Sequence, residues 1–187
     1  MLFSVSGSIA SGKTTFIKAL KESLHAVVFE EPVEEWKEYF DRLQADFNKD
    51  TVYALQEKIY EYYHSVLVHI RKNPANLVLM ERSHIENIFC FIIPIASKCG
   101  ELEPRMINLI NTLLDEYHEI SLITKVNTLY LPVLQPTVLA ERTKKRNQPN
   151  DKYLDTAFFE DHVKIYKSFI NFATIEGNVP RCYKDFL

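Results

Sequence analysis

The stretch GSIASGKTT, Gly7 to Thr15, follows the apolar run MLFSV at the start of the sequence. The chain has only four glycines, and two of them, Gly7 and Gly12, hold the glycine positions of the pattern G-x-x-x-x-G-K-[ST]. Glycine lets a loop turn tightly and bring successive backbone N–H groups close to a phosphate. The pattern therefore predicts a strand, a phosphate loop over residues 7–14, and a helix whose positive N-terminal end faces a triphosphate.

Two side chains of this loop are expected to act on the ligand directly. Lys13 is expected to reach the β- and γ-phosphates of ATP, and Thr14 is expected to bind Mg²⁺. The loop backbone supplies the remaining contacts. ATP and Mg²⁺ are thus the predicted cofactors, and the predicted nucleotide-binding residues are Gly7, Ser8, Ile9, Ala10, Ser11, Gly12, Lys13, Thr14 and Thr15.

The composition suits one globular domain over residues 1–187. The chain is 47% hydrophobic, enough for a full core, and its formal net charge is −3. A nucleic-acid polymer or an anionic membrane requires a basic face, so neither is expected as a partner. The three cysteines lack C-x-x-C spacing, and there is neither a basic leader nor an apolar run of about 18 residues. These features favour a reducing compartment and a cytoplasmic location.

Short apolar runs alternate with longer helical patterns along the chain. Strands are expected at residues 2–6, 26–30, 77–80, 128–133 and 172–175. Helices are expected at residues 13–25, 34–46, 50–71, 83–98, 103–119, 136–145 and 152–172. This alternation predicts an α/β fold of the P-loop nucleoside triphosphate hydrolase type, a three-layer sandwich with a five-stranded parallel sheet and helices on both faces. Ligands of such sheets bind beyond the carboxyl ends of the strands.

Charged side chains follow two of the expected strands. Pro32 holds the preceding residue extended, so we expect the Glu31 carboxylate at the tip of the second strand, where a substrate can reach it. Glu81 and Arg82 follow the third strand. A carboxylate there can hold Mg²⁺ through water, and an arginine can neutralise charge on a transferred phosphoryl group. The alternative is an ion pair before a helix that has Ser83 as its N-cap.

A cationic segment and one glutamine complete the candidate site. Arg142 and Arg146 stand one helical turn apart, and as a lid over residues 142–151 they can clamp phosphate oxygens. A solvated face or a nuclear-targeting patch is the alternative. Gln56 lies beside the apolar stripe of the helix expected at 50–71, where its amide can meet a nucleobase edge, although a solvated glutamine is commoner.

These motifs, in this order and spacing, resemble the deoxynucleoside kinase family over nearly the whole chain. The resemblance implies that Glu31 is the general base for a 5′-hydroxyl and that Arg82 lies beside the reacting oxygen. It further implies that Glu81 is the magnesium carboxylate. The residues implied to bind the substrate or close over it are Trp36 in the substrate pocket, Gln56 at the base, and Arg142 with Arg146 in the lid.

The sequence departs from the family pattern at four positions. Family members carry a tyrosine for the sugar 3′-hydroxyl before the glutamine, and Asn48 stands near that place. In family members a glutamate after the lid also binds this hydroxyl, and the corresponding segment of this chain, RNQPND, contains only Asp151 as an acidic residue. Tyr63 and Asn87 replace an arginine and an aspartate that pair around the base in one family member, which leaves the base preference open.

The predicted function is transfer of the γ-phosphoryl group of ATP to the 5′-hydroxyl of a deoxynucleoside, thymidine or deoxycytidine, for nucleotide salvage. Thymidylate kinase is the alternative, because it shares the sheet, the loop and a lid. Its monophosphate acceptor is already anionic, so the Glu31 carboxylate would repel it, whereas a neutral hydroxyl benefits from a base. A further alternative is a nucleotide-binding switch without catalytic activity. Guanine-binding switches carry the motif N-K-x-D, and this chain has only NKDT at Asn48, which does not match it.

A homodimer is expected from the two helices at 50–71 and 103–119. Their apolar residues occupy more than one helical face, which exceeds the need of a single core. The residues concerned are Ile59, Tyr62, Val66, Met106, Ile110 and Leu113. The family resemblance also implies a dimer formed through a helix pair.

Overall fold

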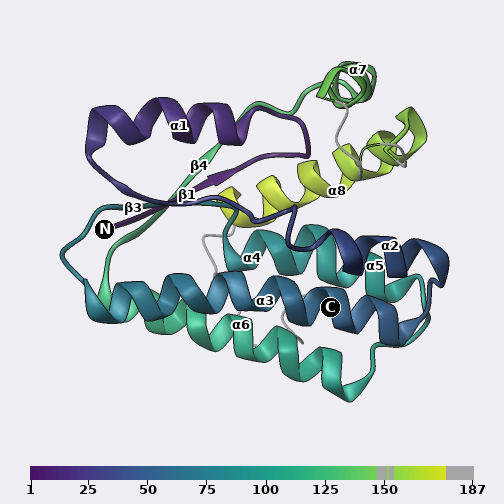
Figure 1. The fold of residues 1–187 in the computed structure, drawn as a ribbon, viewed down its shortest axis with the longest axis horizontal. Coiled ribbons are helices and arrows are strands. Elements are labelled where there is room, and N and C mark those ends of the chain that lie inside the picture. The colour runs from purple at the N-terminus through teal and green to yellow at the C-terminus, as the bar shows by residue number, and fades with distance from the viewer. Residues whose placement is uncertain (147–150, 152–153, 176–187) are drawn as a thin grey trace.

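A computed structural model describes residues 1–146, 151 and 154–175. The described residues form a four-stranded parallel sheet with the strand order β2-β3-β1-β4 (Figure 1). The strands are β1 (Leu2–Ser6), β2 (Val27–Phe29), β3 (Val78–Glu81) and β4 (Val126–Tyr130). Because all four run the same way, their carboxyl ends lie at one edge, and the loops that carry the predicted site leave from that edge.

The helices differ in length and are distributed over both faces of the sheet. Their bounds are α1 (Lys13–Leu24), α2 (Lys37–Ala45), α3 (Lys49–Lys72), α4 (His84–Asn87), a π-helical segment η1 (Ile88–Ile92), α5 (Ile93–Ser97), α6 (Pro104–Ile123), α7 (Pro136–Arg146) and α8 (Thr156–Ile175). Figure 1 shows α1 on one side of the sheet, with α3, α4 and α6 on the other. The predicted three-layer α/β arrangement is therefore confirmed.

Alternating side chains of the strands build the two cores. Val5 and Leu79 point to the α1 side, where they pack with Ile17. Leu2 and Met80 point to the opposite side and join the larger core with α3 and α6. β1 and β3 are buried on both faces, which is why both read as continuous apolar runs rather than alternating ones.

The expected fifth strand is wrong. Residues 172–175 belong to α8, and the described residues contain four strands. Phe159, Val163, Tyr166 and Phe169 are buried at spacings of four, three and three residues, which is the helical period. A short apolar run at the end of such a helix cannot be told from a buried strand by its pattern alone.

The helix expected at 83–98 is divided into α4, η1 and α5. At the end of η1, the N–H of Ile93 donates to Ile88 O, five residues back, which is the π-helical bond. Pro94 follows at the start of α5 and has no N–H to donate to the preceding turn. The change of helical register therefore falls where the proline interrupts the ordinary ladder.

The apolar residues that suggested a dimer lie inside the chain. All six are buried in the larger core, where α3 packs against α2 and α6. The single chain thus covers the extra apolar faces, and the homodimer stays a prediction of the family resemblance alone. In the part of the chain that the structure describes, no helix has both the length and the apolar character needed to cross a membrane.

Candidate active site

The predicted phosphate loop lies between β1 and α1, and its two glycines are needed for different reasons. A Cβ on Gly7 would lie 2.7 Å from Ser11 Oγ and 3.2 Å from Leu131 Cβ, so both side chains would have to shift to admit one. Gly12 adopts a φ of 101°, in the left-handed region that favours glycine. No side chain caps α1 at Gly12, so the first N–H groups of this helix face the loop, as anion binding requires.

Lys13 is buried and crosses the loop in this structure. Its Nζ donates to Gly7 O at 2.9 Å and to Ser8 O at 3.0 Å. Burial, together with the nearby charge of Arg82, lowers the pKa of Lys13 to about 8, against the opposing effect of Glu31, Glu86 and Glu81. The ammonium group is thus held by loop carbonyls, where incoming phosphate oxygens can compete for it.

The carboxylate of Glu81 joins the tips of two strands to α1. Thr14 Oγ1 donates to Glu81 Oε1, and the backbone N–H of Glu31 donates to Glu81 Oε2 at 3.2 Å. The hydroxyl of Tyr62, on α3, lies 2.9 Å from Phe29 O and 3.0 Å from Glu81 O. These contacts hold the ends of β2 and β3 beside the start of α1.

Glu31 and Arg82 form a buried ion pair at the ligand edge of the sheet. Arg82 NH1 contacts Glu31 Oε2, and the two side chains are only 7% and 10% exposed. Although burial would lower the pKa of Arg82, the Glu31 and Glu86 carboxylates more than offset this and raise it above its usual range. Arg82 has a φ of 56°, a left-handed conformation that costs free energy in a non-glycine residue.

The predicted base-binding residues lie at the N-cap of α2 and on α3 and α4. Trp36, Gln56, Tyr63 and Asn87 are all buried, so the alternative of a solvated Gln56 is wrong. The Trp36 ring meets Tyr62 edge-on, with ring centroids 6.1 Å apart. Among the described residues, Gln56 Oε1, the Tyr63 hydroxyl and Asn87 Nδ2 have no hydrogen-bond partner. Buried polar atoms without partners are costly, and a ligand with polar edges can satisfy them.

The two arginines predicted to form a lid, Arg142 and Arg146, lie on α7, which Figure 1 places near the loop end of the sheet. Arg142 NH1 lies 3.5 Å from Ala10 O and 3.4 Å from Ser11 O, so it reaches the predicted phosphate loop. Arg146 Nε donates to Asp151 Oδ2 at 2.9 Å. Residues 147–150 of the predicted lid lie outside the described residues.

The sequence matches the family model described as deoxynucleoside kinase over residues 3–179. The chain belongs to the deoxynucleoside kinase family. As a member, it is an ATP-dependent kinase. No curated protein matches it.

Solved structures of deoxyadenosine kinase from M. mycoides share the fold. The one with bound dATP is 21% identical, covers 94% of this chain and 86% of its own, and has a TM-score of 0.68. The one with bound dCTP is 24% identical, with the same coverage and a TM-score of 0.62. A third, with the products dCMP and dCDP, is 21% identical, covers 92% and 85%, and has a TM-score of 0.61.

This deoxynucleoside kinase gathers five predicted residues within one set of contacts. The set consists of Lys13 and Thr14 at the start of α1, Glu31 after β2, Glu81 at the end of β3 and Arg82 directly after it. Each is joined to another of the set by a contact or an electrostatic effect. Thr14 and Glu81 offer a hydroxyl and a carboxylate oxygen at one point, the oxygen ligands that suit Mg²⁺. The described residues contain no cluster of three or more histidine, cysteine or acidic ligands.

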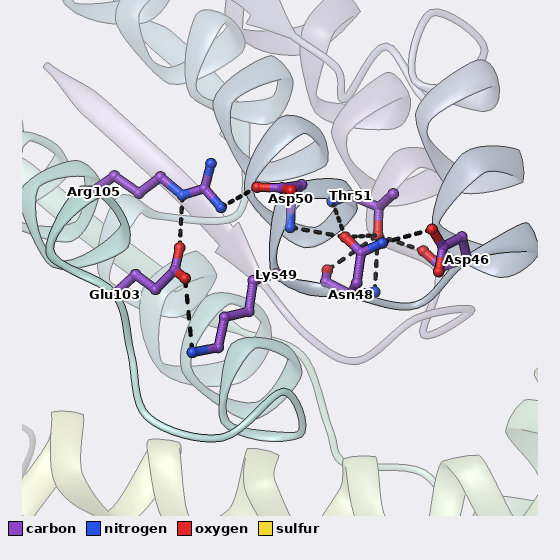
Figure 2. A network of polar contacts seen from close by, with 7 residues as sticks. All are labelled: Asp46, Asn48, Lys49, Asp50, Thr51, Glu103 and Arg105. Atoms are coloured by element: carbon purple, nitrogen blue, oxygen red, sulfur yellow. Dashed lines mark hydrogen bonds and ion pairs between the residues drawn. The ribbon is translucent and has the colours of Figure 1, made fainter.

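Asn48 has a local structural role in this kinase. It is the N-cap of α3, and its Oδ1 accepts from the N–H groups of Asp50 and Thr51 at 2.9 and 3.0 Å. Its Nδ2 donates to Asp46 Oδ2 at 2.7 Å. Figure 2 shows this cap beside ion pairs that join the start of α3 to the start of α6. Both ends of the Asn48 amide are therefore engaged.

Sequence reasoning missed Glu86, a fully buried carboxylate beside the predicted phosphate loop. Its backbone N–H donates to Ser83 Oγ at 3.1 Å, as in a capping box of the S-x-x-E type. That spacing would assign the Glu86 side chain to the helix start. The carboxylate turns instead toward Gly7 N, 3.4 Å away, and toward Arg82 and Tyr166.

Proposed function

We propose that this kinase transfers the γ-phosphoryl group of ATP to the 5′-hydroxyl of a deoxynucleoside, and that its substrate is thymidine, deoxycytidine or both. The observation that supports this most directly is the buried Glu31–Arg82 pair, which lies beyond the strand ends next to Lys13. A carboxylate there can accept a proton from a neutral hydroxyl, whereas it would repel a monophosphate. The M. mycoides enzyme binds dCTP and dCMP as well as dATP, so a cytosine nucleoside is compatible with this fold.

In the proposed reaction the 5′-hydroxyl loses its proton to Glu31 as its oxygen attacks the γ-phosphorus in line. The bond from the γ-phosphorus to the bridging oxygen of ADP breaks in the same step, and Lys13 and Arg82 balance the charge that moves onto the phosphoryl oxygens. Thr14 and Glu81 would hold Mg²⁺, which would supply positive charge beside the triphosphate. Arg142 and Arg146 would close over the triphosphate from α7.

The deoxynucleoside would lie against α2, α3 and α4. Trp36 supplies an apolar wall, and the unpartnered polar atoms of Gln56, Tyr63 and Asn87 are available to the base edge. We propose Asp151 and Asn48 for the sugar 3′-hydroxyl; either would have to exchange its present partner for the substrate.

The direct test is an assay with radiolabelled ATP against thymidine, deoxycytidine, deoxyadenosine, deoxyguanosine and dTMP. Label in a pyrimidine deoxynucleoside monophosphate is the expected result. Label that appears only in dTDP, with dTMP as the acceptor, would identify a thymidylate kinase instead and refute the proposal.

The substitution Glu31→Gln tests the role of the base. It keeps the size of the side chain but removes the proton acceptor, so we expect nucleoside turnover to fall by about 10² to 10⁴-fold while nucleoside binding changes little. The matched control is Glu34→Gln, an exposed carboxylate on the same loop that should retain wild-type turnover. A monophosphate kinase predicts the opposite result, because loss of a nearby negative charge would improve dTMP binding.

A further inference from the structure

Glu86 collects contacts from three separate parts of the chain. The carboxylate is fully buried, and its Oε1 accepts from the Tyr166 hydroxyl and lies 3.4 Å from Gly7 N and 3.3 Å from Arg82 Nε. Gly7 begins the phosphate loop, Arg82 follows β3, and Tyr166 is in the middle of α8. One oxygen atom therefore joins the phosphate loop, the catalytic arginine and the last described helix.

Burial of this carboxylate has a cost. Burial raises the pKa of Glu86 to about 7, although Arg82 and Lys13 act to lower it. Such a carboxylate is tolerated when charged partners and hydrogen-bond donors surround it. Here the charged partner is the guanidinium that the proposed reaction uses.

The Arg82 guanidinium is fixed on three sides. NH1 contacts Glu31, Nε faces Glu86, and the ring of Phe91 lies against the guanidinium carbon at 4.4 Å from its centroid. In the proposed reaction Glu31 accepts a proton and becomes neutral. Arg82 then loses one of its two anionic partners at the moment when its position matters most, and Glu86 is the partner that remains.

We propose that Glu86 is a positioning residue, which holds the Arg82 guanidinium beside Glu31 and links it through Gly7 and Tyr166 to the phosphate loop and α8. The kinetic consequence rests on the proposed function, because Arg82 must act on the transferred phosphoryl group. The structural consequence, a fixed Arg82 side chain, does not depend on the identity of the substrate.

The kinetic test is made above the raised pKa of Glu86, where the wild-type carboxylate is charged, and uses Glu86→Gln. This variant keeps the acceptor oxygen for Tyr166 and removes the charge that holds Arg82. Misplacement of a catalytic group by about 1 Å can cost about 10²-fold in rate, so we expect kcat to fall by about that factor. The KM of the nucleoside should stay within about twofold, because Arg82 acts on the transition state rather than on substrate binding.

A matched control separates this role from the general effect of removing a buried carboxylate. Glu116, on α6, is also buried and accepts from Tyr60 OH at 2.7 Å and from His64 Nδ1 at 2.6 Å. Glu116→Gln should retain wild-type kcat. If Glu86→Gln does not fold, Tyr166→Phe carries the test, since it removes one donor to Oε1 and should lower kcat by about tenfold.

A second readout is independent of activity. Arg82 Nε is buried and lies 3.3 Å from Glu86 Oε1, an ion-pair contact without hydrogen-bond geometry, so the NMR signal of its N–H should exchange slowly with water in the wild type and shift or broaden in Glu86→Gln. A wild-type enzyme that phosphorylates none of the nucleosides would refute the proposed function, and the Arg82 signal would still decide the role of Glu86. A wild-type kcat together with an unchanged Arg82 signal in the variant would overturn the proposal.

Discussion

His84 gives the chain a built-in sensitivity to acid. The residue is fully buried between the rings of Tyr63 and Tyr117, with centroid distances of 4.7 and 6.0 Å. Neither ring nitrogen has a hydrogen-bond partner in the described ranges. Burial lowers the pKa of His84 from 6.5 to about 3. The folded chain therefore keeps this imidazole neutral at a pH where the unfolded chain protonates it.

The sign and size of the effect follow from this difference. Stability from the neutral imidazole is fully present above about pH 6.5 and is lost as the pH falls toward about 3. Since one pKa unit corresponds to about 1.4 kcal/mol, a change from about pH 7.5 to about pH 5 should cost about 2 kcal/mol of unfolding free energy at this site.

Two other buried groups titrate in the same range. Burial also lowers the pKa of His162 to about 3, so His162 adds a loss of the same sign. Glu86 acts in the opposite direction, because a raised pKa means that the folded chain binds the proton more tightly and gains stability as the pH falls. The wild-type profile alone therefore mixes the three effects, and only a difference from a variant isolates His84.

The assay is urea unfolding at about pH 7.5 and about pH 5 for the wild type, His84→Phe and His84→Asn. Neither replacement can titrate in this range. Phenylalanine keeps an aromatic ring, and asparagine keeps a polar group. Whatever their stability at the higher pH, both should lose about 2 kcal/mol less than the wild type on acidification. Equal losses in all three proteins would refute the reasoning.

Two further predictions concern the phosphate loop and the oligomeric state. Lys13→Ala should abolish phosphoryl transfer and leave the melting temperature nearly unchanged, because the buried ammonium already carries a desolvation cost; a folded variant with wild-type turnover would remove the loop assignment. Light scattering at micromolar concentration should show a homodimer, and a monomer there would contradict the family expectation.

Much of the architecture could be predicted because parallel sheets have a strong sequence pattern. Buried runs alternate with helical patterns, charged residues stand directly after two of the runs, and Lys13 follows the first run at the end of the phosphate-loop pattern. The rule that strand ends meet at one edge was sufficient to place Lys13, Glu31 and Arg82 near each other. The prediction of a fifth strand was wrong for the opposite reason. Residues 172–175 are a short apolar run without a periodic pattern of their own, and they belong to α8.

Long-range contacts and local roles limited the prediction of the site. Tyr166 is 80 residues from Glu86 in sequence, and its position on a buried helical stripe favours a core residue. Glu86 itself fits a capping box, so the local pattern assigns it elsewhere. Asn48 shows the converse. Its distance from Gln56 along the chain suggests a substrate contact, whereas an N-cap asparagine with a hydroxyl residue three positions later is sufficient to explain its presence.

The charges around the phosphate loop place a condition on nucleotide binding. In the part of the chain that the structure describes, the carboxylates of Glu31, Glu81 and Glu86 lie around two buried cations, Lys13 and Arg82. Because the pKa of Glu86 is raised to about 7, this group is partly protonated at neutral pH, and the site still has no excess of positive charge before any phosphate arrives. A triphosphate adds more negative charge to the same low-dielectric region, where repulsion is strong.

Mg²⁺ at Thr14 and Glu81 would offset part of this negative charge. Arg142, which already reaches the loop carbonyls of Ala10 and Ser11, can supply further positive charge by turning from those carbonyls to the phosphates. The lid arginine is therefore expected to contribute to ATP binding as well as to the chemical step.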